Sequence, residues 1–284
     1  MNGGEVRRRL LGDLLAVGAP YGLALAGGDA VRAHGLVDRP GQGIDVATES
    51  PVGTGDIVAA VRAGLEERGW RVRTSETEPL AARLVVGDLG VVGGEEAGTR
   101  AGTGAGTGAG AEAGTEAETG AETEAEAGAG TEAGTGAETE AGASARAGTA
   151  LRQEFAVQVV KEVLWRPLEV GEFGPVLSLE DLVGTRVRAL AGQGLAPDLV
   201  DVHAAADRWS HPELEELGRR HAGGVFDLAD LQTRLVGAEW IDDRAFAACG
   251  LDDRAIAELR RWAQEWADDI GERLAESAAP PEDE

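Results

Sequence analysis

Cysteine and lysine are nearly absent from this chain of 284 residues, and long apolar runs are absent altogether. The single cysteine, Cys249, excludes an intrachain disulfide and any zinc site built from several cysteines. Lys161 is the only lysine, so the other 25 of the 26 basic residues are arginine, which indicates a GC-rich gene rather than a function. No stretch reaches the roughly 18 apolar residues that a membrane span needs, and we expect no transmembrane helix.

Basic residues are also few in comparison with acidic ones. The chain has 51 Asp and Glu against 26 Lys and Arg, which gives a formal net charge of −25. So acidic a chain is repelled by nucleic-acid phosphates unless a local basic patch overrides the field. We therefore expect no strong direct DNA binding as the main function.

The N-terminal region has one feature of an export signal, because three arginines at residues 7–9 precede an apolar run. Asp13 interrupts that run. Five apolar residues of the run fit one face of a helix: Leu10, Leu11, Leu14, Leu15 and Val17. We interpret residues 5–18 as an amphipathic helix of a cytoplasmic protein, with export as the less favoured alternative.

Residues 95–148 consist almost wholly of Ala, Gly, Glu and Thr. This stretch contains 11 Glu and two Arg, and no aromatic residue, Leu, Ile, Val or Pro. It cannot bury enough apolar surface to offset the conformational entropy of the chain. We predict a disordered insert, and a functional acidic arm is the alternative.

The two flanks of the insert predict an α/β core over residues 1–94 and 149–177. Apolar and alternating runs predict strands at residues 23–26, 44–48, 70–74, 81–86 and 155–160. Apolar spacing predicts helices at residues 5–18, 29–37 and 56–68. The fold class we expect is a mixed sheet with flanking helices. The insert then joins two neighbouring strands as an enlarged hairpin loop, which is tolerable because closure entropy grows slowly with loop length.

The pattern becomes helical after the core, and we predict a helical domain over residues 178–275 and a flexible tail over 276–284. Its last apolar stripe contains Trp262 and Trp266, which we interpret as core residues rather than as a ligand site.

Residues 23–49 carry the pattern most informative about function. A strand leads into a turn at Gly27 and Gly28, a helix follows, and the next strand contains Asp45. Glycines before a helix expose backbone N–H groups to a phosphate. An aspartate on the following strand can hold a Mg²⁺ ion that bridges triphosphate oxygens. The pattern predicts nucleotide binding at Gly27 and Gly28 and a metal ligand at Asp45.

This order resembles the AbiEii-type toxin family of the nucleotidyltransferase superfamily, in which a Gly-Gly-Ser/Thr turn precedes an Asp-x-Asp strand. Residues 39–48 look like the actinobacterial form of that strand. Residues 177–190 are similar to the next family segment, and residues 197–202 to its Arg-Asp-x-x-Asp. The resemblance covers most of residues 5–275 apart from the insert.

The resemblance implies a role for individual residues. The implied catalytic residues are Asp45, Arg186, Asp198 and Asp201, and the implied nucleotide-binding turn is Gly27, Gly28 and Asp29. The residue pattern alone is equally consistent with Asp198 and Asp201 capping the start of a helix. Asp29 stands where the family has Ser or Thr, Arg186 where it has Lys, and Pro197 where it has Arg.

Two of the three metal-binding acids of the family pattern are missing. Gly43 stands at the first acid of Asp-x-Asp, and Gln158 at the acid of the following strand. Asp45 alone would hold Mg²⁺ weakly, because two-metal transfer needs several converging carboxylates.

The function that the resemblance implies is transfer of a nucleotide from an NTP to an unidentified acceptor. It also implies a biological role as the toxin of a toxin–antitoxin or phage-defence pair, with a cognate antitoxin protein as partner. The alternative is a catalytically silent member of the same fold that binds a nucleotide or a partner protein.

Overall fold

The computed structural model describes residues 3–39, 41, 43–88, 153–224 and 226–278. The predicted insert at residues 95–148 lies outside the described residues. Within the described ranges, no helix combines the length and the apolar character needed to cross a bilayer.

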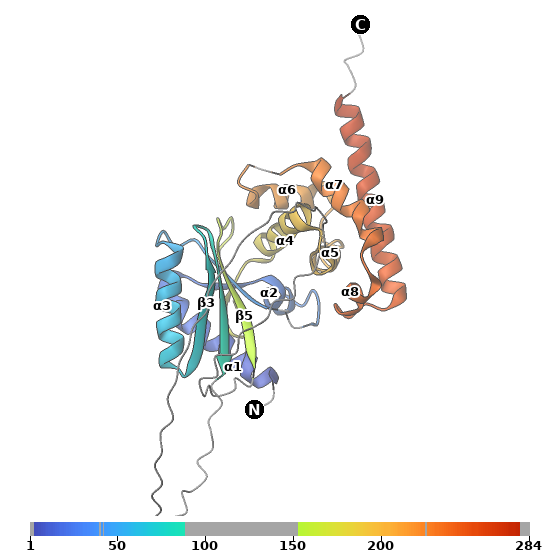
Figure 1. The fold of residues 1–284 in the computed structure, drawn as a ribbon. Coiled ribbons are helices and arrows are strands. Elements are labelled where there is room, and N and C mark those ends of the chain that lie inside the picture. Colours follow the sequence, from blue (N-terminus) through green and yellow to red (C-terminus); the bar gives the residue numbers. More distant parts are fainter. Residues whose placement is uncertain (1–2, 40, 42, 89–152, 225, 279–284) are drawn as a thin grey trace, which may run out of the picture. The chain divides into compact units, whose positions relative to one another are not determined.

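A seven-stranded mixed sheet forms the first part of the fold (Figure 1). The strands run in the order β3-β4-β5-β2-β1-β7-β6, with parallel pairing only between β2 and β5 and between β1 and β7. Their bounds are β1 Ala24–Ala26, β2 Ile44–Thr48, β3 Trp70–Thr77, β4 Ala81–Asp88, β5 Glu154–Lys161, β6 Glu169–Gly171 and β7 Gly174–Val176. The predicted fold class, a mixed sheet with flanking helices, is confirmed.

The two faces of the sheet differ because successive side chains of a strand point to opposite sides. One face is buried under helices α1 (Gly3–Gly18) and α3 (Thr54–Glu67), and its strand residues include Ile44, Val86 and Val157. The alternate positions on the central strands face the other way and include polar residues. This second face positions the site described below.

The register of the central strands aligns four residues in one row across the polar face. Arg83 of β4 pairs with Gln158 of β5, Gln158 pairs with Asp45 of β2, and Asp45 pairs with Ala26 at the end of β1. Gln158 thus lies directly beside Asp45, on the strand where the family pattern has an acid.

Helix α2 (Gly27–Ala33) begins at the glycine turn and is shorter than the predicted helix over residues 29–37. Gly35 has a positive φ of 68°, a conformation that does not continue a right-handed helix, and the chain turns there.

The second part of the fold is helical and has its own hydrophobic core. Its helices are α4 (Leu179–Gln193), α5 (Ala196–His203), α6 (His211–His221), α7 (Leu228–Gly237), α8 (Asp243–Ala247) and α9 (Asp253–Ala278). Short 3₁₀ turns span Ala19–Tyr21 and Ala238–Trp240. Helix α9 extends three residues, 276–278, into the predicted tail, and the rest of that tail lies outside the described residues.

The two tryptophans of the last helix differ in burial. Trp266 is fully buried, as predicted, and its indole N–H donates a hydrogen bond to Glu215 at 2.9 Å. Trp262 is partly buried and packs against the second hydrophobic core. It packs edge-on to His203, with the ring centroids 4.9 Å apart.

Deletion of residues 95–148, with a short Gly-Ser turn joining the ends, should leave the melting temperature almost unchanged. Strands β4 and β5 are antiparallel neighbours, and Gly87 pairs with Glu154 where the two strands approach the insert. The deletion removes no apolar side chain larger than Ala, and shortening a loop changes closure entropy only slightly. Thermal unfolding followed by circular dichroism checks this, and loss of cooperative unfolding in the shortened protein would show that the insert supports the fold.

Candidate functional site

A cleft of about 540 Å³ lies between the polar face of the sheet and helices α4 and α5. A volume of this size is in the range of small-molecule sites, roughly 300–1,000 Å³. Its walls include five glycines, which leave the backbone accessible, and eight charged side chains. The glycines are Gly27, Gly28, Gly41, Gly43 and, on α4, Gly192.

Arg186 of α4 is at the centre of the cleft and contacts three carboxylates. Its Nη1 lies 3.1 Å from Oδ1 of Asp198, its Nη2 3.7 Å from Oδ2 of Asp45, and its Nε 3.6 Å from Oδ2 of Asp201. Asp45 comes from β2, whereas Asp198 and Asp201 stand one helical turn apart on α5, which places both on one helix face. The structure therefore brings together all four residues to which the resemblance assigns catalysis.

Arg39 completes this cluster from the segment that precedes β2. Its guanidinium lies 2.5 Å from Oδ1 of Asp201 and 3.4 Å from the Pro197 carbonyl oxygen, to which it donates. The Asp201 side chain is only 2% exposed, so it needs such a partner. Arg39 was not predicted as a site residue, although it lies at the start of the segment that resembles the family strand.

Burial governs the ionisation of the three carboxyl groups. It raises the pKa of Asp45 and of Asp198 above their ordinary values, and the adjacent Arg186 opposes both rises. Burial raises the pKa of Asp201 to about 6, against the opposing charges of Arg186 and Arg39. Each carboxylate would therefore be costly to keep ionised without its arginine partners.

Gly27 makes the close approach of Asp45 and Arg186 to the turn possible. It has a positive φ of 60°, and an added Cβ would lie 1.9 Å from Oδ2 of Asp45 and 2.7 Å from Nη2 of Arg186. The backbone conformation therefore favours glycine at this position, and an added Cβ would also displace the ends of the Asp45 and Arg186 side chains.

Asp29 is close to the turn but does not line the cleft. Its carboxylate accepts a hydrogen bond of 2.7 Å from Arg7, which also donates to the Gly43 carbonyl oxygen at 2.6 Å. The Arg7 guanidinium offsets the Asp29 charge, so that this carboxylate adds little repulsion of an anion at the turn. Arg7 was not predicted, because its partner lies 22 residues away in the sequence.

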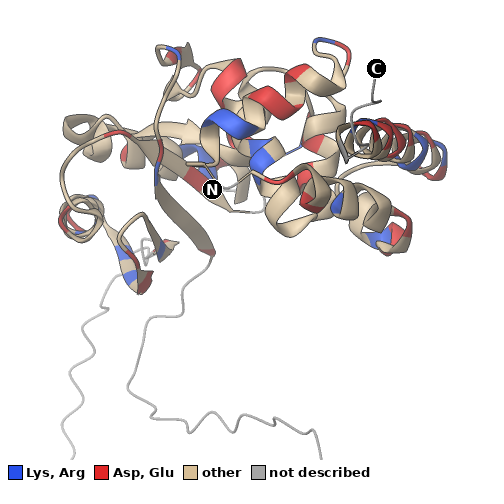
Figure 2. Ribbon diagram, turned by 90° about the horizontal axis from the view of Figure 1, so that it is seen from above, with Lys and Arg blue, Asp and Glu red and all other residues tan. Residues whose placement is uncertain are grey.

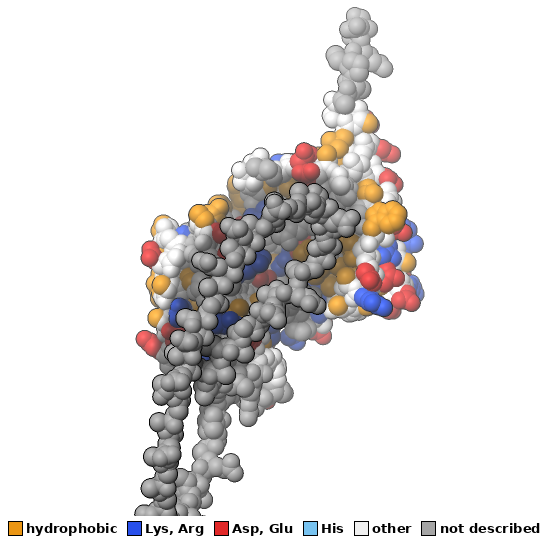
Figure 3. All heavy atoms as spheres, in the orientation of Figure 1, with side chains coloured by type: hydrophobic (Ala, Val, Ile, Leu, Met, Phe, Trp, Pro, Cys, Tyr) orange, Lys and Arg blue, Asp and Glu red, His pale blue; other side chains and the backbone are white. Residues whose placement is uncertain are grey.

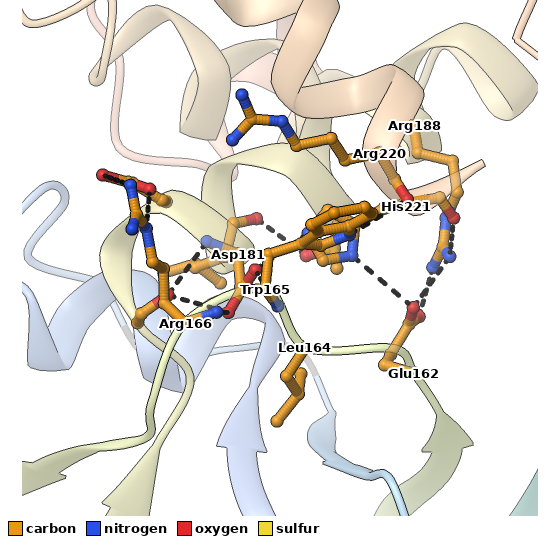
Figure 4. Close-up of polar contacts among 12 residues, drawn as sticks. Glu162, Leu164, Trp165, Arg166, Asp181, Arg188, Arg220 and His221 are labelled. Atoms are coloured by element: carbon orange, nitrogen blue, oxygen red, sulfur yellow. Dashed lines mark hydrogen bonds and ion pairs between the residues drawn. The ribbon is translucent and has the colours of Figure 1, made fainter. Parts of the chain in front are cut away.

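A second polar network lies at the end of β5 and borders the cleft (Figure 4). Glu162 accepts two hydrogen bonds from Arg188, and the buried His221 imidazole lies between Glu162 and Asp181, with its Nε2 3.2 Å from Oδ1 of Asp181. Asp181 also accepts from the backbone N–H groups of Trp165 and Arg166, each at 3.0 Å. The network therefore ties the loop after β5 to helices α4 and α6.

The charges in the cleft balance, in contrast to the strongly acidic chain as a whole. The basic lining residues are Arg39, Arg83, Arg186 and Arg188, and the acidic ones are Asp45, Glu162, Asp198 and Asp201. Figure 2 shows both signs of charge interleaved along the helices. Among these described lining residues, Arg83 alone has no partner of opposite charge, and its side chain is exposed.

The residues around Asp45 do not fit a magnesium site of the predicted kind. The positions flanking Asp45 hold Gly43 and Gln158, neither of which offers a carboxylate, and Asp198 is already paired with Arg186. Among the described residues, no three or more His, Cys, Asp or Glu side chains form a group suited to holding a metal. Mg²⁺ takes near-octahedral oxygen ligands at about 2.0–2.1 Å, and Asp45 would supply one carboxylate of that shell, which makes a weak site.

A second cavity, of about 550 Å³, lies in the helical part and is lined by His203, Trp209, His211 and Trp262 among others. Its only Asp, Glu, Lys or Arg lining residue among those described is Asp207. On the face visible in Figure 3, hydrophobic side chains lie among charged ones around α9. The sheet cleft has the richer set of polar and charged groups.

Comparison with known proteins supports the fold. No family model matches the sequence, and no curated protein matches it. Among solved structures, the chain is similar to MenT4, a nucleotidyltransferase toxin from Mycobacterium tuberculosis, with a TM-score of 0.50 and 13% identity over 93% of this chain and 83% of that one.

Two structures from Helicobacter pylori are also similar. A proposed nucleotidyltransferase has a TM-score of 0.47 and 11% identity, over 99% of this chain and 100% of that one. The protein JHP933 has a TM-score of 0.44 and 14% identity, over 98% and 96% of the two chains. The likeness to MenT4 shows that this chain has a nucleotidyltransferase fold, as the resemblance predicted.

Proposed function

We propose that, on this nucleotidyltransferase fold, the cleft binds a nucleoside triphosphate. The observation that carries the proposal is the convergence of Asp45, Arg186 and Asp198 from three separate segments into a cleft of suitable volume. The turn at Gly27 and Gly28 lets a phosphate approach the backbone closely, because neither residue has a side chain.

Arg83 is the residue best suited to bind a phosphate group at the far end of the site. Adjacent strands are about 4.8 Å apart, so Arg83 stands roughly 10 Å from Asp45 along the row of paired residues. A triphosphate that extends from the glycine turn over Asp45 would bring its charge toward this guanidinium. The other lining arginines already neutralise carboxylates, whereas Arg83 does not.

Replacement of Arg83 by Ala should weaken nucleotide binding by roughly 10- to 100-fold, because a hydrogen bond to a charged group contributes about 1.5–3 kcal/mol. Isothermal titration with each NTP checks this. Arg71→Ala is the matched control: Arg71 is exposed on the neighbouring strand β3, and it does not line the cleft. If the Arg83 variant and the control bind nucleotide equally well, Arg83 does not form part of the site. If wild type gives no heat of binding with any NTP, the proposal of nucleotide binding is refuted.

A second candidate function is nucleotidyl transfer to an acceptor, in a toxin that has a cognate antitoxin as partner. The likeness in fold to a nucleotidyltransferase toxin favours it, as does the gathering of Asp198 and Asp201 around Arg186. The neutral Gly43 and Gln158 beside Asp45 oppose it, because Gln158 cannot accept a proton from an attacking hydroxyl. We therefore place nucleotide binding first.

Incubation of the protein with labelled NTPs and total RNA or total protein separates the two functions. Label that becomes covalently attached in wild type, and not in Asp45→Asn, would establish transfer. Binding without attached label would identify the silent member of the fold. A small DNA-binding protein encoded in the adjacent gene would support the toxin role.

A further inference from the structure

The central arginine of the cleft has the electrostatic role that a divalent cation has in a carboxylate cluster. Such a cation neutralises converging carboxylates and holds them in place. We propose that the Arg186 guanidinium is the resident cation of this site, so that the cleft binds its ligand with no divalent cation held by the protein. The statement about the ligand rests on the proposed nucleotide binding, whereas the role of Arg186 does not.

The geometry of the guanidinium matches this role. Each of its three nitrogens is nearest a different carboxylate, with Asp198 at 3.1 Å, Asp201 at 3.6 Å and Asp45 at 3.7 Å. A planar fork can bridge groups in several directions, whereas a lysine ammonium is a single point charge. Arg186 can therefore bridge all three carboxylates, which a lysine at this position could not do.

The surroundings of Arg186 hold its guanidinium in a fixed position. Its side chain is only 17% exposed, and the missing side chain of Gly27 leaves the space that Arg186 and Asp45 share. Arg39 takes up much of the charge of Asp201, so that Arg186 is left to bridge Asp45 and Asp198.

The same residues disfavour a metal ion at this place. An ion at Asp45 would need further oxygen ligands from the strands, and Gly43 and Gln158 supply no carboxylate. It would also face the positive charge of Arg186, 3.7 Å from Asp45. The lack of a carboxylate at Gly43 and Gln158 is therefore consistent with the presence of the bridging Arg186.

The test is a titration with Mg²⁺ or Mn²⁺ in the absence of nucleotide, at matched ionic strength. In wild type, we expect no rise in melting temperature that is specific to a divalent cation. Electron paramagnetic resonance should show no Mn²⁺ binding that depends on Asp45, so wild type and Asp45→Asn should leave the same amount of Mn²⁺ free. Arg186→Gln should melt at a lower temperature. Mg²⁺ should then raise its melting temperature by at least about 3 °C, because Asp45 and Asp198 lack their counter-ion while Asp201 keeps only Arg39.

Arg188→Gln is the matched control, because Arg188 also lines the cleft but pairs with one carboxylate, that of Glu162. Its melting temperature should not respond specifically to Mg²⁺. If Arg186→Gln does not fold, Arg186→Lys takes its place, and a rise with Mg²⁺ is again expected because one ammonium cannot bridge all three groups.

Two results would overturn the proposal. One is Mn²⁺ binding to wild type that requires Asp45, and the other is a folded Arg186 variant that gains no stability from Mg²⁺. Nucleotide titrations of the same wild-type protein, in Mg²⁺ and in EDTA, keep the two proposals separate. Absence of nucleotide binding would refute the proposed function and leave the role of Arg186 standing, whereas binding that is lost in EDTA would refute the statement that the ligand binds without a divalent cation.

Discussion

Trp266→Ala should lower the free energy of unfolding by about 3–5 kcal/mol, the usual cost of removing a large buried aromatic side chain. Trp266 is fully buried among the helices of the second core. Its loss also removes the indole hydrogen bond to the buried Glu215, which then keeps only its hydrogen bonds from Arg273 among the described residues. Chemical denaturation followed by circular dichroism measures the change.

Trp240→Ala is the control for this measurement, because Trp240 is 85% exposed in the turn before α8. Its effect should stay within about 0.5 kcal/mol. Similar losses in the two variants would mean that the second core does not depend on Trp266 in particular.

Gly27→Ala should abolish nucleotide binding and destabilise the protein. The new methyl group would overlap Oδ2 of Asp45, which lies 1.9 Å from the Cβ position, and would press on Arg186. The backbone strain of a residue with positive φ adds about 1–2 kcal/mol. Titration calorimetry and thermal unfolding measure the two effects.

Gly22→Ala separates strain from collision, since Gly22 has nearly the same φ, 61°, and an added Cβ there meets nothing within 4 Å. We expect this control to lose some stability from strain and to keep its nucleotide affinity. If Gly27→Ala binds nucleotide as tightly as Gly22→Ala does, the turn does not form part of the site.

The strands that carry the paired residues Arg83, Gln158 and Asp45 could be predicted, because the apolar and alternating patterns of a strand involve only residues close in sequence. Strands at residues 44–48 and 155–160 were predicted and are present, and their pairing places Gln158 beside Asp45. The helical character of residues 178–275 was likewise predicted, and helices α4 and α5 lie within that range. The roles of Asp45, Arg186, Asp198 and Asp201 stay predictions, although the structure brings these residues together.

Elements that sequence analysis missed are short or lack an apolar pattern. Strands β6 and β7 have three residues each and are too short to show alternation. Helix α6 has polar residues at most positions, but Ser210 and Glu213 form a capping box that could have revealed its start. No role could be assigned to Arg39 and Arg83 from the sequence. Their roles depend on whether a carboxylate from a remote part of the sequence lies beside them in space, as Asp201 does beside Arg39.

Hydrogen–deuterium exchange with and without NTP tests whether the cleft at Asp45 and Arg186 binds a nucleoside triphosphate. We expect slower exchange with nucleotide in peptides that contain the turn at Gly27 and Gly28, strand β2 and the part of α4 around Arg186. Unchanged exchange in all three peptides, or protection confined to the aromatic cavity around His203 and Trp262, would show that the nucleotide does not bind in this cleft.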